Sequence, residues 1–184
     1  MPMTGRIRVY DEKPLVLFAD TCESATEMPP APFPAFTSIP RLHIFSHSLK
    51  EFAVPQFSAN EISTPWLMFD DKANALLISP ATNFFVASMS GDGRQMVASG
   101  FNARLRNLPA GFTHQTWLAF GAGINRTWEL WGSAMRLLQN AKRPPYDADV
   151  ILKYLGYWTD NGATYYYNYD LKKGYAGTLQ SLVQ

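Results

Sequence analysis

Residues 155–170 combine the side chains that a sugar-binding site needs. An apolar run ends at Trp158, Asp160 and Asn161 follow it, and the next residues are rich in tyrosine. Aromatic rings pack against the C–H face of a pyranose, and a carboxylate accepts hydrogen bonds from paired hydroxyl groups. Trp158, Asp160 and Asn161 are therefore the candidate substrate-binding residues. A loop of packed aromatic side chains with a turn at Asn161 explains the same composition, and composition alone leaves the two interpretations equal.

A pair of glycines forms a second candidate site. Gly121 and Gly123 stand between an expected strand and an expected helix, which is the context of a dinucleotide-binding loop. Arg126 occupies the position of the third glycine of that motif, and Pro144 and Pro145 stand where a second strand with a ribose-binding acid would be needed. A tight turn from strand to helix requires glycine for backbone reasons alone. We therefore favour a structural turn and expect no cofactor.

The histidines are candidate metal ligands. His43 and His47 are four residues apart, which is a ligand spacing on a helix, but Pro40 and the surrounding β-type sequence predict an extended chain. In a strand these two residues lie about 13 Å apart. We expect ordinary hydrogen-bonded histidines here and at the isolated His114, and no metal site.

Two further reactive residue types have structural explanations. Asp70 and Asp71 could form an acid and base pair, but adjacent residues of a strand point to opposite faces. A turn with Asx-type hydrogen bonds is the simpler interpretation. Cys22 has no activating neighbours, so we expect a buried or inert thiol. No catalytic residue is predicted.

Short apolar or alternating segments dominate the first two thirds of the chain and predict antiparallel strands. Gly91, Asp92 and Gly93 supply the turn of the clearest hairpin, because glycine adopts the positive φ angles of tight connections. The proline-rich residues 28–40 predict an extended crossing segment, anchored by Phe33 and Phe36. The expected strands cover residues 6–10, 15–18, 67–69, 76–78, 83–90, 94–102 and 113–120.

The period of the pattern changes after Gly123. Apolar residues from Ile124 to Leu138 recur every three or four positions, which predicts a helix with Asn125 as its N-cap. Residues 151–158 then predict a strand and residues 175–184 a helix. Strand, loop and helix together form the opening of an α/β unit.

The overall composition excludes several classes of protein. The chain has 184 residues, a net charge of +1, 17% charged and 14% aromatic residues, which argues against a disordered tail. A net charge of +1 argues against a protein that binds nucleic acid through an excess of positive charge. No apolar run is long enough for a membrane span, the N-terminus lacks the apolar core of a signal peptide, and a single cysteine forms no internal disulfide. These features favour a soluble, cytoplasmic protein.

The segment Gly156-Tyr157-Trp158-Thr159-Asp160 resembles the first barrel strand of the α-galactosidase and raffinose-synthase clan of glycoside hydrolases. Residues 77–84 and 108–112 resemble parts of the galactose mutarotase-like β-supersandwich that precedes that barrel, and residues 125–140 resemble the connecting helix. In the clan, the catalytic acids come from later barrel strands than this one.

The resemblance implies a mainly β fold class. Residues 1–123 would form an antiparallel β-sandwich, residues 124–150 a connector helix with a proline-containing linker, and residues 151–184 the first βα unit of an incomplete (β/α)8 barrel. The implied function is that of an accessory N-terminal region of a carbohydrate-active hydrolase, inactive on its own. Its partners would be a carbohydrate and the remainder of the barrel.

Two other functions stay open. A non-catalytic sugar-binding or scaffold β-sandwich accounts for the strand-rich region equally well. A nucleotide-binding protein that uses Gly121 and Gly123 is the third hypothesis.

Overall fold

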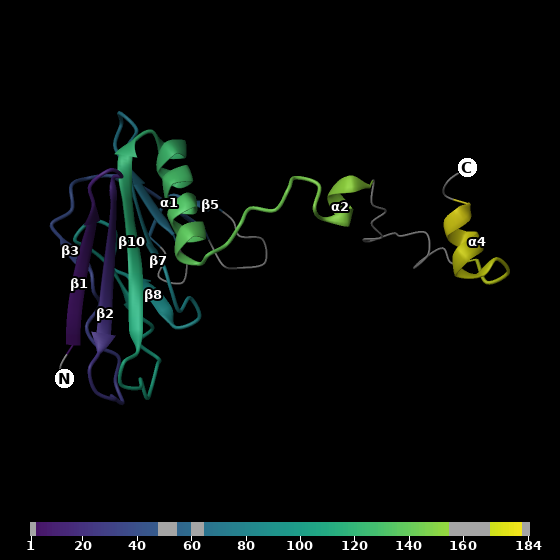
Figure 1. The fold of residues 1–184 in the computed structure, drawn as a ribbon. Helices are drawn as coiled ribbons and strands as arrows, with labels where there is room; N and C mark the ends of the chain where they lie inside the picture. The colour runs from purple at the N-terminus through teal and green to yellow at the C-terminus, as the bar shows by residue number, and fades with distance from the viewer. Residues whose placement is uncertain (1–2, 48–54, 60–64, 155–169, 182–184) are drawn as a thin grey trace. The chain divides into compact units, whose positions relative to one another are not determined.

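The computed structural model describes residues 3–47, 55–59, 65–154 and 170–181 (Figure 1). The chain divides into two compact units, Met1–Ala141 and Lys142–Gln184. The first unit holds all the described strands and one long helix, and the second holds two short helices.

The first unit contains two antiparallel sheets, and the predicted mainly β, antiparallel character is confirmed. The larger sheet has seven strands in the order β1-β2-β10-β7-β6-β4-β5, and the smaller has the order β3-β9-β8. The strands of the larger sheet are β1 (Met3–Tyr10), β2 (Leu15–Cys22), β4 (His43–His47), β5 (Pro55–Gln56), β6 (Trp66–Phe69), β7 (Asn74–Pro80) and β10 (Thr113–Ala122). The smaller sheet contains β3 (Ala35–Thr37), β8 (Ala87–Ser90) and β9 (Met96–Phe101).

The two sheets pack against each other through one apolar cluster. Trp66, Met68 and Ile78 of the larger sheet share this cluster with Met89 and Val97 of the smaller sheet. These side chains alternate along their strands with residues that point to the opposite face, as the two-residue period of a strand requires. Burial on both faces explains why the central strands are almost continuously apolar.

Helix α1 (Ile124–Leu138) covers the opposite face of the larger sheet (Figure 1). Trp128, Trp131 and Met135 pack against a cluster that includes Leu77 and Trp117. The predicted helix is therefore present, and it lies inside the first compact unit.

The N-cap of α1 is Gly123 and not the predicted Asn125. Gly123 has a φ of 96°, a conformation that favours glycine. Its carbonyl accepts both the N–H and the hydroxyl of Thr127, each at 3.0 Å. Gly123 thus serves the strand-to-helix turn, as the structural interpretation predicts, while Gly121 lies within β10 opposite Ala75 of β7.

The predicted hairpins and the proline-rich crossing are also present. Strands β8 and β9 pair on either side of residues 91–95. Phe33 and Phe36 both make edge contacts with the ring of Phe18, at 5.8 and 5.9 Å between centroids. Cys22 is fully buried, in agreement with the prediction of a buried or inert thiol.

The second unit contains α2 (Val150–Lys153) and α4 (Gly174–Gln180). The predicted strand over residues 151–158 is wrong at its start, because residues 151–153 belong to α2. Asp149 caps this turn by accepting the N–H of Ile151 at 2.9 Å, and a capped turn outweighs the β propensity of two or three residues. Helix α4 confirms a helix at the predicted residues 175–184, beginning one residue earlier at Gly174. No helix in the described ranges is both long and apolar enough to span a membrane.

Candidate functional site

A solvent-open hollow of about 690 Å³ lies where four segments of the first unit meet. These segments are the start of β4, the residues that follow β5, the turn between β6 and β7, and the turn between β8 and β9. The volume lies within the range typical of small-molecule sites. The lining residues are Arg41, Leu42, His43, Ile44, Phe57, Ser58, Ala59, Asp70, Asp71, Asp92 and Arg94.

Asp70 fixes the turn between β6 and β7. Its Oδ1 accepts the backbone N–H groups of Lys72 and Asn74 at 2.9 and 2.8 Å, and its Oδ2 accepts the side-chain amide of Asn74 at 2.8 Å. The amide of Asn74, helped by these N–H groups, holds the pKa of Asp70 below its usual value. The predicted Asx-type role of this aspartate is confirmed, and the turn holds Asp71 on the hollow.

Asp92 has the same role in the turn between β8 and β9. Its Oδ1 accepts the N–H groups of Arg94, Gln95 and Met96 at 2.9, 2.7 and 3.2 Å, and these bonds lower its pKa, the bond from Arg94 most of all. Gly93 lies so close to β4 that a Cβ atom there would be 2.0 Å from Cδ1 of Ile44. Contact with β4 therefore places this hairpin turn on the wall of the hollow.

His43 and Phe57 complete the lining of the hollow. Nε2 of His43 lies 2.7 Å from Oδ1 of Asp71, and its ring packs 5.2 Å from that of Phe69. The side chain of Phe57 is 76% exposed and makes an edge contact with Phe45 at 5.7 Å. The prediction of a hydrogen-bonded histidine in an extended chain is confirmed for His43.

The hollow is equipped to bind a ligand that carries many hydroxyl groups. Its carboxylates accept hydrogen bonds, the guanidinium groups of Arg41 and Arg94 donate them, and Phe57 presents an exposed ring. The lowered pKa values keep Asp70 and Asp92 ionised. A general acid for glycoside cleavage needs the opposite shift, so these two carboxylates are suited to binding and not to proton donation.

A second polar group lies between the two sheets. Asp20 on β2 and His114 on β10 are directly opposite in register, and both are almost completely buried. Nε2 of His114 lies 3.3 Å from the hydroxyl of Thr116, which donates to Ser99 at 2.8 Å. Acid, imidazole and hydroxyl groups thus come together here. Because these side chains are buried, a substrate cannot reach them, so we assign them a structural role.

The predicted substrate-binding residues Trp158, Asp160 and Asn161 lie outside the described residues. No group of metal-ligating side chains is present in the part of the chain that the structure describes. Sequence reasoning missed the hollow because its residues come from four separate segments. The one available signal was the pair of Asp-containing turns, at residues 70–74 and 91–95, beside isolated arginines.

No family model, curated protein or solved structure matches this chain.

Proposed function

We propose that the first unit is a non-catalytic β-sandwich that binds carbohydrate in the hollow at residues 41–44, 57–59, 70–71, 92 and 94. The observation that carries this proposal is the combination of ionised carboxylates, two arginines and an exposed phenyl ring around one open space. Sugars offer both hydroxyl groups and apolar C–H faces, and this hollow is complementary to both.

Phe57 is the proposed stacking platform. About three quarters of its side chain is accessible, and the ring makes an edge contact with Phe45. The hydrogen bond between His43 and Asp71 orients this carboxylate on the hollow. A sugar hydroxyl can donate to such a carboxylate while it accepts from an arginine, which is the usual cooperative arrangement of a hydroxyl group.

The wider proposal is that the chain is the accessory N-terminal region of a glycoside hydrolase-like protein. The resemblance of residues 77–84, 108–112 and 156–160 supports it. In the second unit, Ile151 and Leu152 are 73% and 59% exposed, and they offer apolar surface to the remainder of a barrel. The first barrel strand would begin at Tyr154, which is extended (φ −124°, ψ 148°), and Trp158, Asp160 and Asn161 would make further sugar contacts at its end.

Phe57→Ala is expected to weaken sugar binding roughly tenfold, because a stacked aromatic contact is worth about 1 kcal/mol beyond the area it buries. The measurement is isothermal titration of the chain with galactose, raffinose and maltotriose. The matched control is Phe85→Ala, since Phe85 is also an exposed phenylalanine but does not line the hollow. The control is expected to bind like the wild type.

Two results would contradict the proposal. One is that none of the three sugars binds at millimolar concentration, and the other is an equal loss of affinity in both phenylalanine variants. Asp160→Ala separates the two proposed sites. If this variant loses sugar affinity while Phe57→Ala keeps it, the sugar binds at the second unit and not in the hollow.

A further inference from the structure

Strand β1 forms one edge of the seven-stranded sheet. In the sheet order it is followed only by β2, with which all eight of its residues pair from Met3 to Tyr10 (Figure 1). The other side of β1 has no neighbouring strand among the described residues. An edge strand presents backbone N–H and C=O groups that a further strand can bind.

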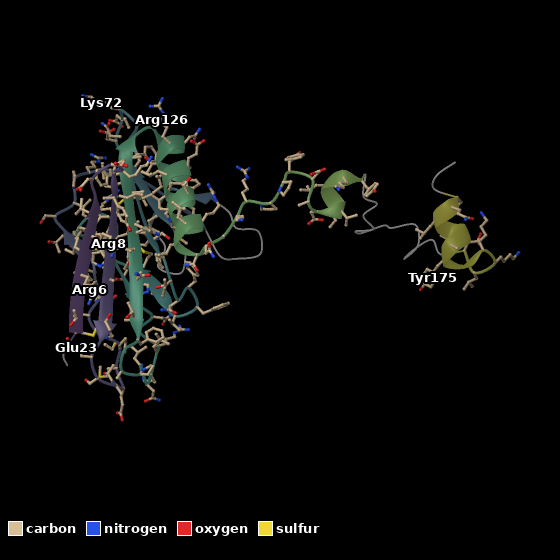
Figure 2. All side chains as sticks on the ribbon, viewed as in Figure 1. Arg6, Arg8, Glu23, Lys72, Arg126 and Tyr175 are labelled. Carbon is tan, nitrogen blue, oxygen red and sulfur yellow. The ribbon has the colours of Figure 1, made fainter. Side chains whose placement is uncertain are left out.

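The two faces of β1 differ in chemistry. Ile7 and Val9 lie on one face and are 61% and 65% exposed. Arg6 and Arg8 alternate with them and lie on the other face, and both are exposed (Figure 2). Neither arginine takes part in a salt bridge within the described ranges. The strand therefore carries an apolar stripe and a basic stripe beside an edge that no described strand covers.

The segments that pack on the two faces of the larger sheet leave the side chains of β1 residues 6–9 exposed. On the apolar side, the ring of Phe33 lies over Gly5, with its nearest atom 3.4 Å from the position of a Cβ there. On the basic side, helix α1 packs mainly against β10 and β7. The exposed part of β1 thus extends beyond both layers.

The charge of β1 selects between two kinds of additional strand. A second copy of this chain would bring its own Arg6 and Arg8 onto the same face, and like charges on neighbouring strands destabilise the pairing. A segment that alternates acidic and apolar residues would place carboxylates beside the arginines and apolar side chains beside Ile7 and Val9. We propose that β1 binds an extended acidic-apolar peptide segment as an eighth strand of the sheet.

The test uses the full chain and a fluorescently labelled peptide in which glutamate and valine alternate. Binding is followed by fluorescence anisotropy, and amide hydrogen exchange of residues 3–10 is expected to slow in the complex. The variant Arg6→Glu/Arg8→Glu should weaken binding at least about tenfold, because attraction becomes repulsion at two positions. The same variant should gain binding to a peptide that alternates lysine and valine.

Lys72→Glu/Arg126→Glu is the matched control, because it changes the net charge equally at positions away from β1 (Figure 2). It should bind the peptide like the wild type. Equal weakening in both double variants would show non-specific attraction and overturn the proposal. Equal binding of a peptide with its glutamates and valines in separate blocks would do the same. If the wild type sediments with concentration-dependent association, and an equimolar mixture of the wild type with Arg6→Glu/Arg8→Glu associates more strongly than either protein alone, the edge would be assigned to a second copy of the chain instead.

Discussion

Asp20→Asn is expected to stabilise the protein by about 2 kcal/mol at pH 8 and to leave its stability nearly unchanged at pH 4. Asp20 is only 2% exposed, and neither of its carboxyl oxygens has a hydrogen-bond partner among the described residues. Burial raises the pKa of this carboxyl from 3.8 to about 7. At pH 8 the folded wild type must therefore hold a buried, unpaired negative charge.

The size of the effect follows from proton linkage. A tenfold change in proton affinity corresponds to about 1.4 kcal/mol, so the full rise in pKa would correspond to about 4 kcal/mol. Screening and relaxation around the charge reduce this to about 2 kcal/mol. Between pH 3.8 and about 7 the unfolded chain loses this proton while the folded chain keeps it, so wild-type stability falls as the pH rises.

His114 makes the free energy of unfolding depend on pH in the opposite direction. Burial lowers the pKa of its imidazole from 6.5 to about 4, so the folded state stays neutral while the unfolded state gains a proton. Its contribution is complete above pH 6.5 and is lost as the pH falls toward 4. In the wild type, the pH dependences of stability contributed by Asp20 and His114 largely cancel between pH 4 and 6.5. In Asp20→Asn only the slope of His114 remains, and stability should rise with pH across that range.

Urea unfolding followed by circular dichroism at several pH values measures these differences. Asp11→Asn is the control, because it removes the same charge from an exposed turn. It should show the pH profile of the wild type. A profile of Asp20→Asn that is parallel to the wild type at all pH values would mean that this carboxyl is not buried in the folded protein.

The longer strands of the first unit were predictable because their signals are local, whereas the short strands β3 and β5 were not among the expected ones. Alternation around Val9, the apolar run at Leu77 and the glycines at positions 91 and 93 each act within a few residues. The same holds for the Asx turn at Asp70, whose partners are two and four residues away. Such features depend on the backbone near them and not on the rest of the fold.

The features that were missed depend on contacts between distant segments. Burial of His114 is decided by its position opposite Asp20 and under Phe101, whose ring centroid lies 5.2 Å from the imidazole. The hollow is lined both by Arg41, next to β4 of the larger sheet, and by Arg94, between β8 and β9 of the smaller sheet. The start of α2 was missed for another reason, because the apolar run at residues 150–152 has strand propensity while its cap, Asp149, decides the local structure.

Trp117→Ala is expected to lower the free energy of unfolding by about 3–5 kcal/mol, the typical loss for a truncated core tryptophan. Trp117 is 3% exposed and lies in the cluster shared by the larger sheet and helix α1, with its ring 5.7 Å from that of Tyr10. The cavity would lie directly under the helix. Because α1 belongs to the same compact unit as the sheets, helix and sheet signals should be lost in one urea transition at lower concentration.

Trp117→Phe separates the loss of packing from the loss of the indole N–H. This N–H is buried without a hydrogen-bond partner among the described residues, so its removal breaks no hydrogen bond with them. Phenylalanine also fills much of the space that the indole ring occupies. We expect a loss of no more than about 1.5 kcal/mol for this variant. Circular dichroism in the far and near ultraviolet reports the helix and the aromatic packing separately. If Trp117→Ala shifted the aromatic transition but left the helical one in place, α1 would be an independent connector and would not form part of the core of the first unit.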